Sequence, residues 1–265
     1  MVKIIVLNDN RKNNNYLENE HGLSLYIEAY GYKMLLDVGQ TNIFKKNAEK
    51  LGIDLDGLDA IVLSHGHYDH GNGLKYIDKK IKLICHPECN CYRVSKRTRN
   101  YGGIDQTEEE LLQKFDVLKT TKPYEIAENI FFLGQIERNN HFEANSFPMT
   151  KEDGTDDIVL DDSGLVIKTE NGLIVISGCS HSGICNTVEY AKKITNENRI
   201  LAVMGGFHLK EVNECTIKTI DYMQNNNVQK IYLAHCTSDK VCQEFEKRIP
   251  YKVKTMKVGE EYILE

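Results

Sequence analysis

Short runs in which apolar and polar residues alternate dominate this chain and predict a protein built from many strands. Residues 2–8 are apolar, and residues 23–30 alternate so that every second side chain would face a core. A Gly-Tyr turn joins the latter to a third strand at 33–37, which makes a hairpin. Further strands are predicted at 59–63, 81–85, 115–118, 124–126, 130–133, 164–169, 173–177, 200–204 and 229–233.

Segments with helical periodicity lie between these strands. Thr107 followed by Glu110 resembles a capping box and begins one of them. The others are predicted at 42–51, 72–78, 186–194, 213–226 and 238–247. A hairpin followed by strand–helix units occurs twice along the chain. We therefore expect an α/β protein with two mixed β-sheets packed face to face, helices outside, and a single domain over residues 1–265.

One run of residues carries most of the chemical information. His65, His67, Asp69 and His70 fall within six consecutive residues, after an apolar strand and before a Gly-rich turn. Imidazole and carboxylate are ligands that borderline transition metals prefer. His65 and His67 project to the same side of extended backbone, and Asp69 and His70 follow as the chain turns, so they can face a second point nearby. A solvated polar turn is the alternative, but 3 of the 9 histidines in one window disfavour it.

Three further strands are each followed by a histidine. Ligands at the carboxyl ends of neighbouring strands converge on one crevice, although a single histidine there can also be a packed imidazole. We expect His181 and His235 to join the metal ligands. His208 follows Gly205-Gly206, where backbone amides can approach an anion, so it is better placed as a proton donor or a phosphate contact.

Two roles are open to Asp37, which ends the third strand. Its carboxylate can accept a hydrogen bond from a metal-bound imidazole, or it can cap the helix at 42–51. Asp161 and Asp162 precede a strand and could supply an oxygen ligand, but a turn is the favoured interpretation.

The segment Cys85–Cys91 contains three cysteines, but it lacks the paired spacing of a structural zinc site. The cationic residues after it form either a solvated face or the lining of a mouth for an anionic substrate. Arg93 and Arg97 are the candidates for that second role.

Composition narrows the setting. The net charge is −6 with both signs interspersed, so no nucleic-acid partner is expected. The apolar runs are too short to cross a bilayer, and the first residues begin a strand rather than a signal peptide, so no membrane partner and a cytoplasmic location are expected. The 8 cysteines are then expected to be thiols. The oligomeric state is left open.

These residues together resemble the metallo-β-lactamase superfamily, whose signature H-x-H-x-D-H is present as His65, His67, Asp69 and His70. The resemblance implies a four-layer αββα sandwich, metallo-β-lactamase-like, with two similar halves. It covers nearly the whole chain and narrows to the branch of 7,8-dihydropterin-6-methyl-4-(β-D-ribofuranosyl)aminobenzene-5′-phosphate synthases. The segments that carry the narrower match are Glu20–Ser24, Asp37–Gln40, Ser64–His70, Gly178–Gly183, Gly205–Leu209 and His235–Thr237.

The chain departs from the superfamily at two places. Most members carry Gly-Asp where Gly178-Cys179 stands, and that Asp bridges two metals. The Cys179 thiolate could bridge them instead, or it has no metal role. A histidine that normally precedes this hairpin is also missing, and the resemblance implies that His181 takes its place.

The resemblance implies a metal-dependent hydrolase or transferase of a phosphate-bearing small molecule, such as a pterin-type diphosphate. Zn²⁺ is the expected cation, with Mn²⁺ or Fe²⁺ as alternatives, in a mononuclear or dinuclear centre. Asp69 and His208 are the expected catalytic residues, with Gly205 and Gly206 on the phosphate.

Other classes are disfavoured. A non-catalytic metal or ligand sensor on the same scaffold is the alternative. A diiron oxidoreductase of this fold would usually carry Glu at the position of His67, and a nuclease would normally need a further clamp domain.

Overall fold

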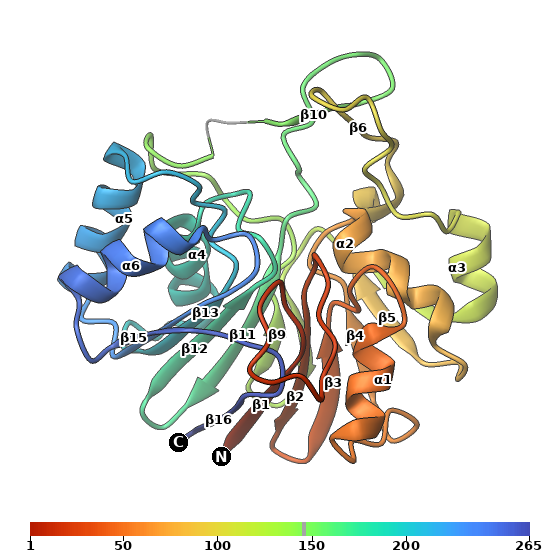
Figure 1. Ribbon diagram of the computed structural model, residues 1–265, viewed down its shortest axis with the longest axis horizontal. Coiled ribbons are helices and arrows are strands. Elements are labelled where there is room, and N and C mark those ends of the chain that lie inside the picture. Colours follow the sequence, from red (N-terminus) through yellow and green to blue (C-terminus); the bar gives the residue numbers. More distant parts are fainter. Residues whose placement is uncertain (145–146) are drawn as a thin grey trace.

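Two seven-stranded sheets pack face to face in the computed structural model, which describes residues 1–144 and 147–265 (Figure 1). The first sheet contains, in spatial order, β16 (Glu261–Leu264), β1 (Val2–Asn8), β2 (Ser24–Ala29), β3 (Tyr32–Leu36), β4 (Ala60–Val62), β5 (Lys82–Cys85) and β7 (Asp116–Lys119). The second contains β15 (Val253–Thr255), β14 (Lys230–Leu233), β13 (Ile200–Gly205), β12 (Gly172–Ser177), β11 (Gly164–Thr169), β9 (Ile130–Phe132) and β8 (Tyr124–Ala127).

The two sheets have the same internal plan. Each has three antiparallel strand pairs and three parallel ones. In each, a hairpin, β2–β3 or β11–β12, joins the antiparallel part to the parallel part. The predicted repeat of a hairpin followed by strand–helix units is therefore confirmed, and so is the four-layer α/β sandwich.

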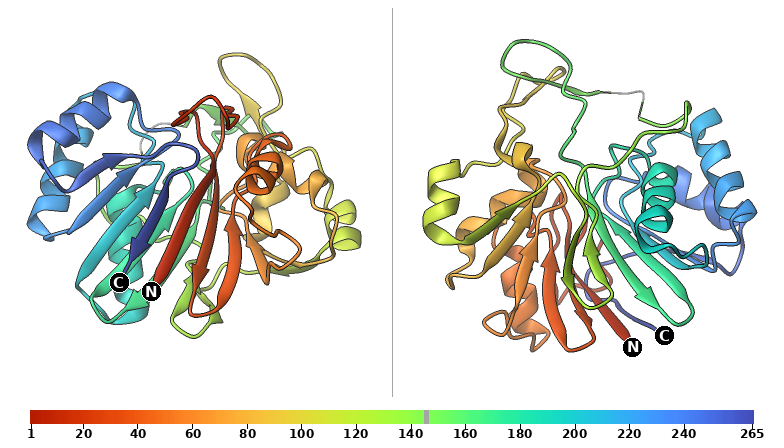
Figure 2. Two further views of the ribbon diagram at one scale, coloured as in Figure 1. Left: turned by 60° about the horizontal axis from the view of Figure 1, so that its bottom comes forward. Right: turned by 180° about the vertical axis from the view of Figure 1, so that it is seen from behind.

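Helices cover the outer face of each sheet (Figures 1 and 2). Those on the first sheet are α1 (Ile43–Lys50), α2 (Tyr68–Gly71) and α3 (Glu108–Lys114), with the short 3-10 helices η1 (Asn72–Tyr76) and η2 (Pro87–Asn90). Those on the second are α4 (Ile184–Thr195), α5 (Glu214–Asn225) and α6 (Asp239–Arg248). A small ribbon of β6 (Val94–Ser95) and β10 (Met149–Thr150) projects above the sheets (Figure 1).

Three apolar layers hold this arrangement together. The central one joins the sheets, for example through Ile4 and Ile27 of the first and Ile174 and Met204 of the second, all fully buried. The other two lie between each sheet and its helices. Burial on both faces explains why these strands are nearly continuous apolar runs, since a strand between two layers has no solvent side.

Several local predictions hold and others need correction. The capping box is present, with the Thr107 hydroxyl accepting from the Glu110 amide and the Glu110 carboxylate accepting from the Thr107 amide. The helix expected at 72–78 is instead the 3-10 helix η1, which follows one turn of α-helix in α2. The strands β15 and β16 were not predicted.

All eight cysteines are free thiols, as expected. None of the described helices has the length and apolar character needed to cross a membrane.

Candidate metal centre

Strands from both sheets end at one edge, and each is followed by a residue suited to metal binding or to its support. Parallel strands place their carboxyl ends together, so loops far apart in sequence meet there. The strands and the residues that follow them are β3 and Asp37, β4 and His65, β12 and Cys179, β13 and His208, and β14 and His235.

His65, His67 and His181 form a first cluster, with ligand atoms within 4.8 Å of one another. Nε2 of His65 lies 2.9 Å from Nδ1 of His67. Nε2 of His67 and Nε2 of His181 are buried without a hydrogen-bond partner among the described residues, and a buried polar atom left unpaired is costly. Burial lowers the pKa of all three imidazoles well below the usual value, so each keeps a lone pair free for a cation.

Asp69, His70 and His235 lie beside this cluster and form a second one. Nε2 of His235 lies 3.2 Å from Nε2 of His70 and 3.3 Å from Oδ2 of Asp69. His21 joins them, because its Nε2 lies 3.0 Å from the same Asp69 oxygen. Its side chain is 53% exposed, so it reaches this cluster from the solvent side.

Sequence reasoning gave His21 no role. The residue lies in Glu20–Ser24, one of the segments that resemble the family, but its spacing does not distinguish it from a solvated loop histidine. Only the packing of its loop against Asp69 reveals it: a Cβ on Gly22 would lie 2.3 Å from the Asp69 carbonyl oxygen.

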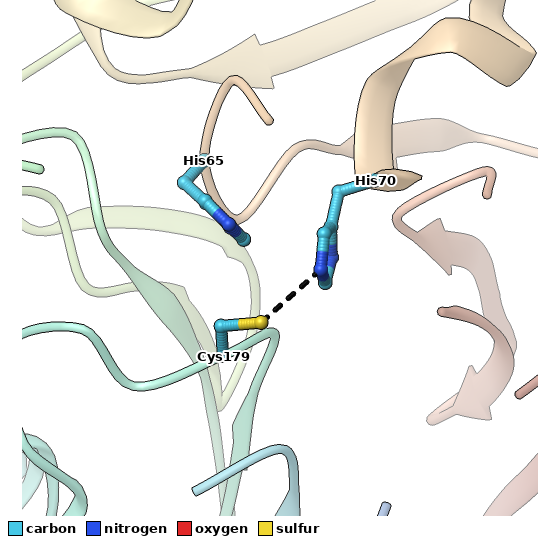
Figure 3. A group of neighbouring side chains, drawn as sticks. All are labelled: His65, His70 and Cys179. Carbon is cyan, nitrogen blue, oxygen red and sulfur yellow. Dashed lines mark hydrogen bonds between the residues drawn. The ribbon is translucent and has the colours of Figure 1, made fainter. Parts of the chain in front are cut away.

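Cys179 lies between the two clusters. Its Sγ is 3.2 Å from Nε2 of His70, and the ligand atoms of His65, His70 and Cys179 all lie within 4.8 Å (Figure 3). Burial raises the pKa of this thiol well above its usual value, so a nearby cation would be needed to hold it as a thiolate at neutral pH. Cys236 also belongs to this region, since its Sγ, that of Cys179 and a His235 nitrogen lie within 4.8 Å.

Asp37 orients one imidazole in each cluster. Its Oδ2 accepts the Nδ1–H of His70 at 2.6 Å and the Ser64 hydroxyl at 2.7 Å. The Ser64 oxygen in turn lies 2.9 Å from Nδ1 of His65. Both Nε2 atoms are thereby left for a cation. The cap of α1 is Asn42, so the alternative of Asp37 as a helix cap is wrong.

The same carboxylate changes the titration of His70. Burial lowers the pKa of His70, but Asp37 and Asp69 together outweigh it and bring the pKa to about 9. His70 is therefore protonated at neutral pH unless a cation displaces its proton.

His235, which follows β14, is held in place by two residues that follow β1. Asn10, just after β1, accepts from Nδ1 of His235 at 2.9 Å through its Oδ1. Oδ2 of Asp9 accepts the His235 backbone N–H at 2.6 Å. Nε2 of His235 therefore faces the second cluster, and burial lowers the pKa of this imidazole to about 4.

Gly66, between His65 and His67, is clamped from two sides. Its N–H donates to Oδ2 of Asp161 at 2.7 Å, and a Cβ at this position would lie 1.7 Å from the Cys89 carbonyl oxygen. Only glycine lets the loop lie this close to η2. Asp161 thus supports the loop backbone, and Asp162 accepts the Ser182 N–H at 2.8 Å next to His181.

The expectation that Arg93 lines an open mouth is wrong. Its side chain is fully buried and forms ion pairs with Asp157 at 3.3 Å and with Asp161 at 3.1 Å. The guanidinium therefore supports the metal loop through Asp161. Arg97 is exposed in the turn after β6, and its contact with a substrate stays a prediction.

Gly205 and Gly206 also differ from expectation. The Gly206 amide donates to the Gly178 carbonyl at 3.0 Å, so it is not free for an anion. A Cβ on Gly205 would lie 2.0 Å from the Ser177 carbonyl oxygen, and one on Gly206 would lie 2.5 Å from Sγ of Cys236. Both glycines therefore serve close packing of strand ends. The predicted phosphate contact through the Gly206 amide is wrong, and the contact through Gly205 stays a prediction.

His208 lies next to the first cluster, with its ring centroid 4.3 Å from that of His181. Its backbone N–H donates to Sγ of Cys236 at 3.2 Å. Burial, with a smaller effect of Lys210, lowers the pKa of His208 to about 4, so the ring is uncharged at neutral pH and can offer an N–H.

Strained backbone marks the same edge. Asp37, Ser180, His208 and His235 have φ values of 59°, 56°, 49° and 43°, a left-handed conformation that non-glycine residues rarely adopt. Such strain persists only where surrounding contacts impose it, and it concentrates at functional sites.

Comparisons with known proteins agree with this geometry. The family model of the Metallo-beta-lactamase superfamily matches residues 18–84, which include His21 and the run from His65 to His70. The 7,8-dihydropterin-6-methyl-4-(beta-D-ribofuranosyl)-aminobenzene-5′-phosphate synthase of Methanocaldococcus jannaschii is 36% identical over 245 residues, 83% of this chain and 82% of that protein. This chain belongs to the metallo-beta-lactamase superfamily.

Two further proteins are similar to this superfamily member over most or all of its length. An uncharacterised protein of Methanocaldococcus jannaschii is 36% identical over 91% of both chains. The crystal structure of Tm1679, described as a metal-dependent hydrolase of the beta-lactamase superfamily, has a TM-score of 0.88 and 30% identity, with both chains fully covered. The fold of this metallo-beta-lactamase superfamily chain is therefore established over its whole length.

Proposed function

We propose that the protein is a metal-dependent enzyme with a dinuclear centre, preferably of Zn²⁺, that acts on a phosphate-bearing small molecule. The two adjacent clusters of buried ligand atoms carry this proposal. His65, His67 and His181 would hold one cation, and Asp69, His70 and His235 the other. Cys179 would contact both, and His21 would complete the second set from the solvent side.

The donor set fits borderline cations such as Zn²⁺, because it combines neutral imidazole, carboxylate and a thiol. The unpaired Nε2 atom of His181 supports this fit, since a bound cation would satisfy a buried atom that otherwise has no partner among the described residues. Two cations at this edge would supply Lewis acidity toward phosphate oxygens and would acidify water at neutral pH.

The protein's own residues would then orient and shield the reaction. Asp37 holds the Nε2 atoms of His65 and His70 toward the centre. Asp69, besides binding metal, would accept a hydrogen bond from the reacting water, and His208 would donate one to a phosphate oxygen. The buried surroundings of these groups strengthen such interactions, because water competes less for them.

The synthase named above supports a phosphate-bearing substrate, because the compound in its name carries a 5′-phosphate. A pterin-type diphosphate is accordingly one proposed substrate. Hydrolysis and transfer share the same requirement here: negative charge on phosphate oxygens must be stabilised while a bond to phosphate oxygen breaks.

The test begins with the purified full chain, analysed for bound metal and then loaded with Zn²⁺, Mn²⁺ or Fe²⁺. We expect two cations per chain and turnover of at least one phosphodiester or diphosphate from a panel that includes a nucleotide and an oligonucleotide. A chain that binds no added cation would contradict the proposal. Tight ligand binding with no turnover under any metal would favour the sensor alternative.

His67→Ala is expected to lower turnover by about 100-fold or more, because it removes a nitrogen from the first cluster. The fold should survive, since this substitution removes no apolar core contact. His141→Ala, which changes an exposed histidine outside both clusters, is the matched control. Metal content and circular dichroism of both variants separate loss of the cation from loss of the fold.

A further inference from the structure

A cavity of about 360 Å³ opens beside the first cluster. Ser180 and His181 form its floor, and its walls come from residues 142–144 and from the loop between β13 and α5. This volume falls within the range of small-molecule sites, and the floor shares His181 with the candidate metal ligands.

Flat and apolar surfaces line much of this cavity. Phe142 and Leu209, from two different segments of the chain, are half-buried and line it, and Phe207 lines it while packing against Phe245. The Lys218 ammonium lies 5.8 Å from the Phe142 ring centroid, which helps to hold that ring in place. The imidazole of His208 adds a further flat face next to the floor.

The charged residues that line the cavity in the described part of the chain are Glu143, Glu211 and Lys210, and only the last forms no charge-neutralising contact there. Glu143 faces the cavity, but its carboxylate accepts the Cys185 and Asn186 N–H groups at 2.9 and 3.0 Å, where the start of α4 stabilises negative charge. Glu211 forms an ion pair with Lys240. Lys210 forms no ion pair with any described residue, so its exposed ammonium is available to an anion.

A second hollow lies outside the two clusters. The hollow near the β6–β10 ribbon is lined by Cys91, Tyr92, Lys151, Glu152 and Asp153. Lys151 is paired there with Glu88 at 3.1 Å. Three of these five lining residues are charged and none belongs to either cluster of candidate ligands, so this hollow serves as the control site for ring binding.

We propose that the cavity lined by Phe142 and Leu209 binds an aromatic ring of the substrate, with the attached phosphate directed toward His181 and the metal ligands. Aromatic phosphates are then the preferred substrate class. The position of the phosphate in this inference rests on the proposed function, because the proposed cations would bind it. The ring contact stands on the cavity itself.

Binding and turnover test it separately. Metal-loaded protein is titrated with phenylphosphonate and with methylphosphonate, which carry the same anionic group and differ in the ring. We expect the phenyl compound to bind at least about tenfold more tightly, since the ring buries apolar area that the methyl group lacks. Equal affinities would overturn the inference.

Phe142→Ala and Leu209→Ala are each expected to reduce the phenyl preference about threefold or more, with methylphosphonate affinity unchanged. Tyr92→Ala, an aromatic truncation in the second hollow, is the matched control and should keep the preference. Loss of the preference in Tyr92→Ala with none in the other two variants would overturn the assigned cavity. If wild type shows the preference but turns over no phosphoester, the proposed function fails and the ring site stands.

Discussion

At the scale of single residues, Asp37 connects the two candidate cation positions. It contacts His70 directly and His65 through Ser64, so one buried carboxylate fixes an imidazole in each cluster. Such support of a ligand by a hydrogen-bonded carboxylate typically contributes 10–100-fold to metal affinity or activity. Its left-handed backbone, with φ of 59°, shows that the local fold is under strain to hold this carboxylate in place.

Cys179 decides whether the two cations share a ligand. Cys179→Ser is expected to lower bound metal from two cations per chain toward one, because a serine hydroxyl is a far weaker ligand than a thiolate. Metal content by mass spectrometry of the purified chain measures this. Cys242→Ser, a buried cysteine of α6 away from both clusters, should keep two cations. Two cations in Cys179→Ser would remove Cys179 from the ligand set.

His70 gives the metal-free protein a pH dependence of known sign. Its pKa is raised in the folded state to about 9, so its pairing with Asp37 stabilises the fold fully below the ordinary pKa of 6.5. That contribution is lost as the pH rises toward 9. Urea unfolding of metal-free protein should therefore give a lower free energy of unfolding at pH 9 than at pH 6.5. In His70→Gln this difference should be smaller, because the variant lacks the contribution of His70. An identical pH dependence in the variant would contradict the assignment.

At the scale of elements, the metal loop depends on its contact with η2. Gly66→Ala is expected to lower activity by about 100-fold, because the new Cβ would lie 1.7 Å from the Cys89 carbonyl and displace His65 and His67. Gly57→Ala is the control, since the nearest atom to its Cβ would be Oδ2 of Asp54, at 3.1 Å. Turnover of the two metal-loaded variants measures the difference, and normal activity in Gly66→Ala would show that the loop tolerates displacement.

The elements that sequence predicted best are those with a strong apolar pattern. β1, β11, β12 and β13 are buried on both faces and therefore read as apolar runs. β15 and β16 escaped because their positions alternate between exposed and half-buried or buried, over three and four residues, which is too short for a periodicity. Their place in the sheets depends on partners more than 20 residues away.

The same limit applies to the site. The run from His65 to His70 and the histidines at strand ends could be predicted, because strand order brings such ends together. The burial of Arg93 could not, since its partners Asp157 and Asp161 lie more than 60 residues away. His21 was missed for the same reason: its role depends on contact with Asp69.

At the scale of the whole molecule, the last strand closes the first sheet against β1. We propose that the chain unfolds as one unit. Removing a buried side chain near either end should then lower the free energy of unfolding of the whole protein. Leu264→Ala is expected to lower the free energy of unfolding by about 3 kcal/mol, because this fully buried side chain packs between the sheets. Ile263→Ala, at a position 51% exposed, should cost less than about 0.5 kcal/mol. Thermal unfolding of both variants should show a single transition.

The pairing of β1 with β16 also brings the two ends of the chain together, away from the candidate metal centre. Val2 lies opposite Leu264, and both termini emerge far from the edge where α2 and the metal loop lie (Figures 1 and 2). A short linker could therefore join the two ends, and the backbone could be opened instead at an exposed turn such as Gly31, where a side chain would meet nothing within 4 Å. Such a circular permutant would keep every ligand of both clusters, because tertiary packing and not connectivity assembles them.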